Sequence, residues 1–423
     1  MTYFSLKSCQ TQDSVYRGEL QVNVTGEGEL RPVENASVII QDTGNPEITV
    51  EETVTNISGQ TSFLSLPAPD PQNSLQISIQ QPYSEYNILV QAPGYESKLI
   101  SGAQILPGVR SLQNVTLSPI TQDARPSDIV ISPHTLYGEY PPKIPEAEIK
   151  PLAENGEIVL SRVVIPEYIV VHDGVPSDPS ASDYYVRYKD YIKNVTSSEI
   201  YATWPESTIY ANILAIMSFT LNRVYTEWYR NRGYNFTITS STAYDQKWIK
   251  DRNIYENIDY LVDSVFANYL SRPGVRQPLL TGYCDGYRTT CNGLSQWGSK
   301  SLGDRGYSAI NILRYYYGSD IYINTAENIS GIPASWPGYT LTVGSSGQKV
   351  QQLQQQLARI SRNFPAIPSV TADGVYGPAT REAVRTFQQV FHLPATGDVD
   401  YTTWYTISDI YVGVTKIAEP GAY

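Results

Sequence analysis

A single glutamate followed by apolar and aromatic residues is the strongest candidate for chemistry in this sequence. Glu199 precedes Ile200, Tyr201 and Trp204. A carboxylic acid among such side chains can keep its proton at neutral pH and give it to a leaving oxygen. The alternative is a solvated residue at a helix end, because most acidic residues lie at the surface. We expect a second carboxylate, Glu206, at the N-terminus of the next helix, where the dipole stabilises negative charge.

The region that must position Glu199, residues 166–336, is predicted to be an α+β domain. Residues 166–174 resemble a strand, and residues 255–270 and 293–318 contain helical spacing. Residues 208–233 predict a long helix that stops at the final glycine. One face of this helix is apolar, formed by Ile209, Ile213, Ile216, Met217, Leu221 and Val224.

The rest of the chain predicts a multidomain protein. Residues 1–120 contain short alternating strands separated by Gly and Pro, which favour an all-β antiparallel sandwich. This region resembles the transthyretin-like and carboxypeptidase-regulatory-like sandwiches, which are usually not catalytic. Residues 121–165 are rich in proline and predict an extended linker. Residues 337–423 predict three short helices around one core.

The C-terminal pattern carries the most specific local signal. Ser346 is the expected N-cap of a helix whose apolar face is Val350, Leu353, Leu357 and Ile360. A second helix follows, with Ala383, Val384, Phe387 and Phe391, and a third contains Trp404. The segment resembles the peptidoglycan-binding repeat of wall hydrolases, with matches at Asp373, Gly374, Gly377, Thr380, Phe387, Gln388 and Trp404. We expect Phe387 and Trp404 in the core and Asp373 and Tyr376 in a loop that contacts glycan or stem peptide.

Two blocks of the middle domain, in YIKNVTSSEIYATWPES and CNGLSQWGSKSLGDRGYSAINILRYYYG, resemble the stage II sporulation protein D and amidase-enhancer (LytB-type) family. The resemblance puts the family's catalytic glutamate at Glu199. Gln246, Ser295 and Gln296 are further candidates for holding a glycan, and each has an alternative role in a turn or a helix cap.

Many members of this family can hold zinc with histidines and two cysteines. Here no histidine lies between His172 and His392, so Cys284 and Cys291 alone would leave a zinc site incomplete. We therefore expect no metal and no other cofactor. The two cysteines either form a disulfide or remain reduced. A cysteine-peptidase site would need His172 as its base, but its strand-like context favours a structural role.

Charge is distributed unevenly along the chain. Residues 1–165 hold 9 Lys and Arg against 19 Asp and Glu, a net of −10, of the −12 of the whole chain. No basic patch indicates a nucleic-acid partner, no apolar run predicts a membrane span, and the N-terminus lacks the pattern of a signal peptide. Because wall polymer is anionic, the acidic part could hold the chain off it by repulsion; a steric block is the alternative.

The order of the parts resembles the clostridial spore cortex-lytic enzymes. That resemblance implies a proenzyme in the spore cortex region, outside the spore core, which cleaves the MurNAc-GlcNAc bond of cortex peptidoglycan during germination as a lytic transglycosylase. It also implies activation by a subtilisin-like protease, which we expect to cut among Leu160, Ser161, Arg162 and Val163. Ordinary glycosidases need two carboxylates, whereas one suffices when the substrate's own 6-hydroxyl replaces water. The alternative is a non-catalytic wall-binding enhancer of other hydrolases.

Overall fold

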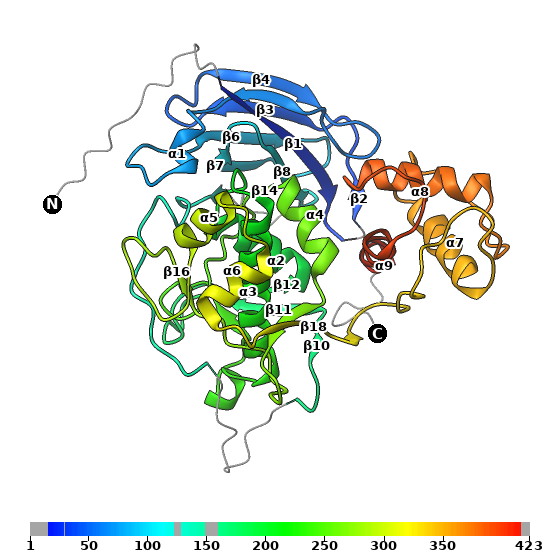
Figure 1. Ribbon diagram of the computed structural model, residues 1–423. Coiled ribbons are helices and arrows are strands. Elements are labelled where there is room, and N and C mark those ends of the chain that lie inside the picture. Colours follow the sequence, from blue (N-terminus) through cyan, green and yellow to red (C-terminus); the bar gives the residue numbers. More distant parts are fainter. Residues whose placement is uncertain (1–15, 29, 122–127, 149–159, 416–423) are drawn as a thin grey trace. The chain divides into compact units, whose positions relative to one another are not determined.

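A computed structural model describes residues 16–28, 30–121, 128–148 and 160–415 (Figure 1). The chain divides into two compact units, and each is described by itself. The first unit comprises Met1–Ser132, Lys250–Glu256 and Pro337–Tyr423, and the second comprises Pro133–Ile249 and Asn257–Trp336. Two segments lie in units other than those expected from the sequence: Lys250–Glu256 belongs to the first unit, and residues 133–148 belong to the second.

The N-terminal part of the first unit contains two five-stranded sheets. The first sheet consists of β1 (Arg17–Gly26), β2 (Arg31–Pro32), β5 (Leu64–Pro67), β8 (Arg110–Leu117) and β14 (Ile254–Tyr255). The second consists of β3 (Ser37–Asp42), β4 (Thr49–Val54), β6 (Ser84–Gln91), β7 (Lys98–Ile105) and β9 (Ile129–Val130). A short helix, α1 (Gln72–Leu75), precedes β6.

Alternate residues of these strands form the core, as the sequence pattern predicts. Leu20, Val22 and Val24 on β1 are fully buried. The expectation of a purely antiparallel sandwich was wrong, because β1 pairs with β8 in parallel along eight residue pairs. Alternation in the sequence indicates which face is buried but carries no information on strand direction.

Residues Lys250–Glu256 lie in the middle of the predicted catalytic region but belong to the sandwich. Their strand β14 pairs antiparallel with β8. The side chain of Asn253 also binds the backbone of Gln104 twice, accepting from its amide at 2.9 Å and donating to its carbonyl at 2.8 Å. Asn253 and Tyr255 are fully buried, so this pairing is part of the sandwich core.

The second unit surrounds one long buried helix, α3 (Glu206–Tyr225), in which 16 of the 20 residues are buried. The other helices are α2 (Tyr188–Glu199), α4 (Glu256–Val265), α5 (Gln296–Asp304) and α6 (Ala309–Tyr317). The strands are short and form small sheets: β10 (Val164–Ile165), β11 (Tyr168–His172), β12 (Asp183–Arg187), β13 (Ile238–Thr239), β15 (Asn268–Ser271), β16 (Tyr283–Cys284), β17 (Leu294–Ser295), β18 (Tyr322–Thr325) and β19 (Asn328–Ile329).

The long helix ends earlier than the sequence predicts. Glu227 has a positive φ of 45°, which lies outside the right-handed helical region and stops α3 at Tyr225. The expected stop, Gly233, instead follows the short 3₁₀ helix η1 (Arg230–Arg232), with a φ of 83°. The apolar pattern continues across this break, so periodicity alone could not locate it.

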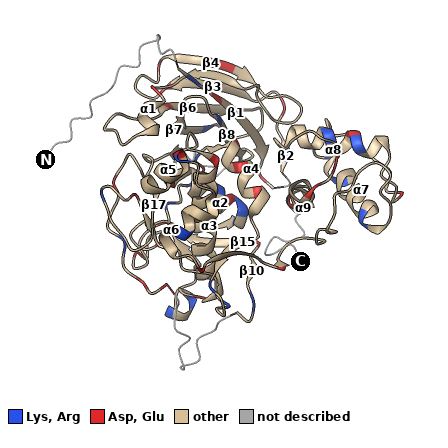
Figure 2. Cartoon of the chain, viewed as in Figure 1, with Lys and Arg blue, Asp and Glu red and all other residues tan. Residues whose placement is uncertain are grey.

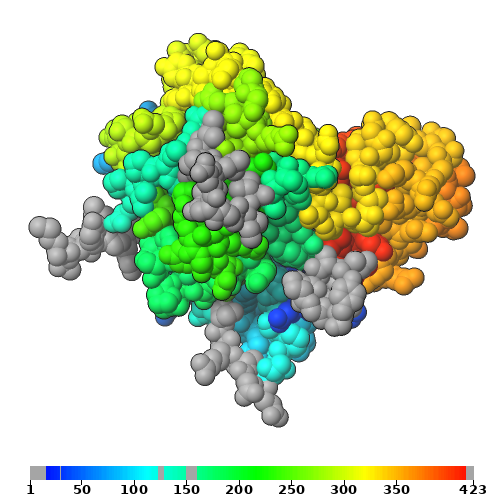
Figure 3. All heavy atoms as spheres, turned by 90° about the horizontal axis from the view of Figure 1, so that it is seen from below, coloured from blue at the N-terminus to red at the C-terminus, as the bar shows by residue number. Residues whose placement is uncertain are grey.

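The C-terminal part of the first unit has the expected helical build, with α7 (Gln348–Ile360), α8 (Pro378–Val390) and α9 (Tyr401–Thr415). Phe387 and Trp404 lie in its core, as expected. The space-filling view shows α7 and α8 with their loops as a closely packed body (Figure 3, orange). The N-cap of α7 is Gly347 rather than Ser346.

The exposed acidic residues of the first third include Glu51 and Glu52 on β4 (Figure 2). Within the ranges that the structure covers, no helix is both long and apolar enough to cross a membrane.

Candidate active site

Glu199 is the last residue of α2 and is completely buried. One carboxylate oxygen, Oε1, accepts a hydrogen bond from the backbone amide of Lys247 at 2.8 Å. The other, Oε2, accepts from Nε2 of Gln296 at 3.1 Å. The hydroxyl of Tyr283 lies 3.5 Å from Oε1. The end of α2, a loop, the start of α5 and the strand β16 therefore meet at this carboxylate, and the alternative of a solvated Glu199 does not hold.

The Lys247 amide is directed at Glu199 because the loop that carries it is fixed to α2. The side chain of Asn194, five residues before Glu199 on α2, donates to the carbonyl of Ile249 at 2.7 Å and accepts from its amide at 3.0 Å. A paired amide of this kind holds the loop in one register. Asn194 was not identified from the sequence, because an isolated Asn in a helix has no distinguishing pattern.

Gln246 was predicted to hold a glycan, but in this structure its side chain is turned into the protein interior. Its side chain is fully buried and forms bonds with the hydroxyls of Tyr191 (3.0 Å) and Thr220 (2.8 Å). Its Nε2 donates to the carbonyl of Ile216 at 3.1 Å. Gln246 therefore ties the loop to α2 and α3 and supports the Glu199 site from behind.

The two other candidates in this region have different roles. Ser295 is the N-cap of α5 and accepts from the amide of Gly298 at 2.9 Å. Gln296, the first residue of α5, contacts Glu199 itself. The predicted pair of glycan contacts is thus replaced by a cap and a residue that positions the carboxylate.

Tyr283 shares the buried environment of Glu199. Burial raises its pKa well above the usual value, and the negative charge of Glu199 adds to the effect. The phenol therefore stays protonated and can donate to the carboxylate.

Three aromatic rings cluster near Glu199: Tyr201 and Trp204 follow it in the sequence, and Trp297 follows Gln296, which binds Glu199. Trp204 and Trp297 have ring centroids 5.0 Å apart, and Tyr201 lies 5.9 Å from Trp204 and 6.1 Å from Trp297. Tyr201 and Trp204 are buried, whereas Trp297 is partly exposed. Such rings offer flat apolar faces that suit the faces of sugars.

Cys284 and Cys291 form a disulfide, with their Cα atoms 6.1 Å apart. The loop that it closes contains Asp285, which is fully buried. Burial alone would raise the pKa of Asp285, but hydrogen bonds from Arg288 and from backbone amides, including that of Thr289, lower it. The loop is therefore organised around a buried carboxylate next to Tyr283.

Replacing both cysteines by serine should lower the free energy of unfolding by about 2 kcal/mol, because the short loop regains entropy in the unfolded chain. The measurement is thermal melting of the Cys284→Ser/Cys291→Ser variant under oxidising and reducing conditions. The wild type should melt like the variant only when reduced. Equal melting of the two proteins under oxidising conditions would contradict a stabilising disulfide.

Arg223 and Asp245 form a buried ion pair that the sequence did not indicate. Nε of Arg223 lies 2.7 Å from Oδ1 of Asp245, and both side chains are fully buried. Burial alone would lower the pKa of Arg223, but Asp245 and Glu146 raise it. Oδ2 of Asp245 accepts from Tyr229 (2.6 Å) and from the amide (2.9 Å) and hydroxyl (2.7 Å) of Thr239. Asp245 thereby fixes the start of the loop that holds Glu199.

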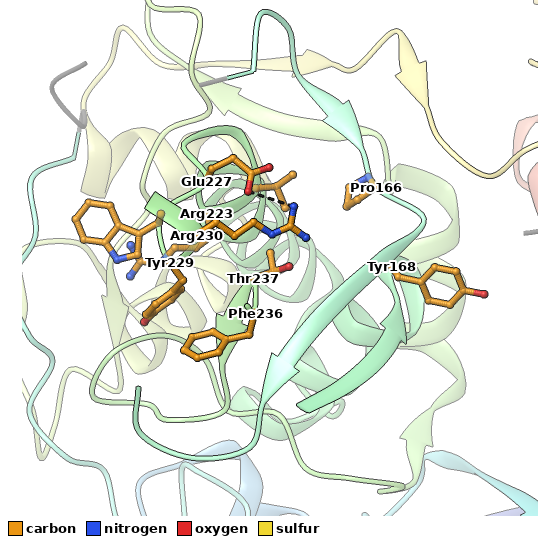
Figure 4. Close-up of a pocket in the computed structure, with 10 residues that line it drawn as sticks. Pro166, Tyr168, Arg223, Glu227, Tyr229, Arg230, Phe236 and Thr237 are labelled. Atoms are coloured by element: carbon orange, nitrogen blue, oxygen red, sulfur yellow. Dashed lines mark ion pairs between the residues drawn. The ribbon is translucent and has the colours of Figure 1, made fainter. Parts of the chain in front are cut away.

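A pocket opens beside this pair, and Figure 4 shows Arg223, Tyr229, Phe236 and Thr237 around it. Its lining contains none of the residues that bind Glu199. His172 lies on β11, bonds to Asp183 at 2.8 Å and stacks on Phe236. These contacts agree with a structural role for this histidine.

Glu206 is the first residue of α3 and is exposed, so it does not compete with Glu199 for the site. Of the predicted cleavage residues, Ser161 and Arg162 are exposed and Val163 is buried. The amide of Leu160 donates to the carbonyl of Tyr225 at 3.1 Å. The sequence just before them, residues 149–159, lies outside the described residues.

In the C-terminal module, formed by α7, α8, α9 and their loops, Tyr376 does not lie in the exposed part of the loop as predicted. It is fully buried, and its hydroxyl donates to the carbonyl of Gly397 at 2.8 Å. Asp373 is exposed, and hydrogen bonds from the amide of Val375 and from Gln354 lower its pKa. Asp373 therefore shapes the turn and also stays accessible.

Two glutamines hold the glycine turns of this module in the same way. Oε1 of Gln354 accepts from the amide of Gly374, and Oε1 of Gln388 accepts from that of Gly397, both at 2.8 Å. Both glycines have positive φ, 77° and 74°. In each case, a buried glutamine side chain binds the amide of the glycine that adopts the left-handed conformation.

Gln354→Leu should destabilise this module by about 3 kcal/mol, because it leaves buried polar groups around Gly374 and Thr380 without partners. Thermal melting, monitored by hydrogen exchange of the amides of residues 346–407, would measure this loss of stability. Gln355→Leu is the matched control, since Gln355 is exposed on the same helix. Equal losses for the two variants would contradict the role of Gln354.

Comparison with known proteins identifies the C-terminal module. Residues 346–407 match the family described as "Putative peptidoglycan binding domain". The zinc D-Ala-D-Ala carboxypeptidase of Streptomyces albus G is 44% identical over 64 residues, which are 15% of this chain and 23% of that protein. The chain therefore covers less than a quarter of the length of this relative. The chain therefore carries a C-terminal peptidoglycan-binding domain, which supports a role at the cell wall.

Two solved structures show partial likeness. The N-terminal domain of SleB is 27% identical, with 18% of this chain and 99% of that chain covered and a TM-score of 0.16. The Bacillus anthracis TIE protein is 18% identical, with 25% and 17% covered and a TM-score of 0.18. These TM-scores assign the whole chain to neither fold.

Proposed function

We propose that this chain is a peptidoglycan lytic transglycosylase in which Glu199 transfers the proton. The observation that carries the proposal is the carboxyl group of Glu199, held by the Lys247 amide and Gln296 in a chain that also has a peptidoglycan-binding domain. Tyr201, Trp204 and Trp297 supply aromatic faces for the sugar rings.

In the proposed reaction, the protonated carboxyl of Glu199 gives its proton to the oxygen that links MurNAc to GlcNAc. The bond from C1 of MurNAc to this oxygen breaks. The 6-hydroxyl oxygen of the same MurNAc then bonds to C1, and its proton passes to the Glu199 carboxylate. The product carries a 1,6-anhydro ring, no water is consumed, and the enzyme returns to its starting state.

The contacts of Glu199 support this role. Gln296 and the Lys247 amide fix the direction of the carboxyl group, so they are positioning groups.

The wider setting is proposed from the resemblance of the parts to a spore cortex-lytic enzyme of the SleC type. In that setting the substrate is cortex peptidoglycan, the location is the spore cortex region outside the core, and the chain is a proenzyme used in germination. A subtilisin-like protease would cut near the exposed Ser161 and Arg162. N-terminal sequencing of the processed form tests this; a start outside residues 155–168 would contradict it.

The second candidate is a non-catalytic enhancer of other wall hydrolases. The complete burial of Glu199 in this structure favours it, because a closed carboxylate cannot reach a substrate. Mass spectrometry of glycan fragments separates the two functions: 1,6-anhydromuramic ends that depend on Glu199 support the enzyme, and their absence from the processed wild type supports the enhancer.

A further inference from the structure

The cover over Glu199 comes from residues 133–148, here called the strap. This segment was predicted to be part of an exposed linker, and the structure contradicts that prediction. His134, Thr135, Leu136 and Tyr140 are buried. The strap belongs to the second compact unit, although it precedes the predicted cleavage region in the sequence. Polar side chains and backbone groups bind the strap. Its sequence lacks the apolar periodicity of a core helix or strand, so its burial could not be predicted from the pattern.

The first end of the strap lies against the residues around Glu199. The amide of Thr135 donates to the carbonyl of Ser198 at 3.2 Å, and Nε2 of His134 lies 3.2 Å from the carbonyl of Ile200. The ring of His134 packs on Tyr201 with centroids 4.5 Å apart. The strap therefore covers one of the three aromatic faces that would otherwise be available to a sugar.

The disulfide loop holds this end from the other side. Arg288 donates to the carbonyl of Thr135 at 2.9 Å and to that of Gly138. The hydroxyl of Thr289 donates to the carbonyl of Tyr140 at 3.1 Å. All these acceptors are backbone atoms of the strap, which forms a turn here: the amides of Tyr137 and Gly138 donate to the carbonyl of His134 at 2.9 and 2.7 Å.

The middle of the strap shares the buried environment of Glu199. Nζ of Lys143 lies 5.0 Å from the ring centre of Tyr283 and donates to the carbonyl of Asp245 at 2.8 Å. Burial lowers the pKa of Lys143, against the charges of Glu199 and Asp245. Burial raises the pKa of Tyr140, and Glu199 contributes. Lys143 and Tyr140 thus lie within the electrostatic reach of Glu199.

The far end of the strap is held by two carboxylates. Glu146 pairs with Arg223 through two bonds, of 2.9 and 2.6 Å. Glu148 pairs with Arg272. Each arginine has a second carboxylate partner outside the strap: Asp245 at 2.7 Å for Arg223 and Asp320 at 2.6 Å for Arg272. Removal of the strap would therefore leave neither arginine without a counter-charge.

We propose that the strap occupies the saccharide groove of Glu199 and blocks it until cleavage near residues 160–163 frees its C-terminal end. This inference rests on the proposed function. The ring of His134 takes the place of a sugar on Tyr201, and the carboxylates of Glu146 and Glu148 take the places of carboxylates of the peptidoglycan strand. In the described part of the chain, the buried hydroxyl of Tyr140 has no hydrogen-bond partner. An unpaired buried hydroxyl favours release of the strap.

The test uses substitutions in the strap, which leave the processed enzyme unchanged. The full-length Tyr140→Ala/Lys143→Ala variant should release wall fragments about tenfold faster than the full-length wild type, because a larger fraction of molecules is open. After limited subtilisin digestion the two proteins should have equal activity. Glu139→Ala is the control, since Glu139 is an exposed strap residue, and it should behave like the wild type before and after digestion.

Hydrogen exchange gives a readout that does not depend on activity. In the full-length double variant, amides of residues 196–204 and 283–289 should exchange faster than in the wild type, with an unchanged melting temperature for the first unit. Equal exchange and equal activity of the full-length double variant and the wild type would contradict the proposal that the strap blocks the site. If exchange is faster but no digested protein releases wall fragments, the covering role of the strap is supported and the proposed reaction is contradicted. Faster exchange throughout the second unit would show unfolding, and the strap would then be a permanent structural element.

Discussion

Glu199→Gln should reduce the release of 1,6-anhydromuramic fragments by the processed protein by about 10³-fold, the scale of general acid–base catalysis. Glutamine preserves the shape of the side chain. Its amide oxygen can accept from the Lys247 amide, and its NH2 group can donate to Oε1 of Gln296 once that amide turns over, but glutamine cannot give or take the proton. The measurement is mass-spectrometric quantification of soluble fragments from purified cortex peptidoglycan.

The matched control is Glu206→Gln, which changes an exposed carboxylate at the start of α3 and should leave the rate unchanged. Binding to insoluble wall should persist in both variants, because the C-terminal module supplies it. Fragments with ordinary reducing ends in place of anhydro ends would contradict the transglycosylase mechanism while keeping a glycan-cleaving enzyme. Unchanged fragment release by Glu199→Gln would exclude Glu199 as the proton donor.

The sequence was sufficient for features that depend on local pattern. The three helices of the C-terminal module follow from apolar spacing, and Phe387 and Trp404 lie in its core as predicted. Glu199 and its walls Ile200, Tyr201 and Trp204 are contiguous in the chain, so their burial could also be anticipated.

Contacts between distant residues could not be predicted in this way. Gln246 and Tyr376 were proposed as ligand contacts, yet both side chains are buried and hydrogen-bonded within the protein. The strap shows the same limit more strongly. Its prolines predict an extended chain, but the strap contains a turn at residues 135–137. Whether such a segment lies in solvent or is packed against the protein depends on Arg288 and Arg223, far along the sequence.

The strap also bears on the acidic first third of the chain. Repulsion between acidic residues and anionic wall polymer acts over about 10 Å at ordinary ionic strength and weakens with salt. A strap bound in the groove excludes substrate at any salt concentration. Wall binding and wall cleavage by the full-length chain therefore distinguish the two: repulsion predicts that salt increases both, whereas the strap predicts that salt leaves cleavage low.

Asp245→Ala should lower the free energy of unfolding of the second unit by about 4 kcal/mol, because removing one partner leaves Arg223 buried with part of its charge uncompensated. For a unit of this size the melting temperature should fall by about 10 °C. The loss should be large because Asp245 also accepts from Tyr229 and Thr239, whose donors lose their partner at the same time. Thermal melting by calorimetry, with the transition of the second unit assigned by hydrogen exchange, measures the effect.

Asp304→Ala is the control for Asp245→Ala. Asp304 pairs with Lys300 at 2.6 Å, but its side chain is 48% exposed, so the expected loss is about 0.5 kcal/mol or less. A similar shift for both variants would contradict the argument from burial. Because Asp245 lies two residues before Lys247, whose amide binds Glu199, the Asp245 variant should also lose fragment release at temperatures where it remains folded. Normal release there would show that the Lys247 amide keeps its place without Asp245, and that the loop is fixed by Asn194 and Gln246 alone.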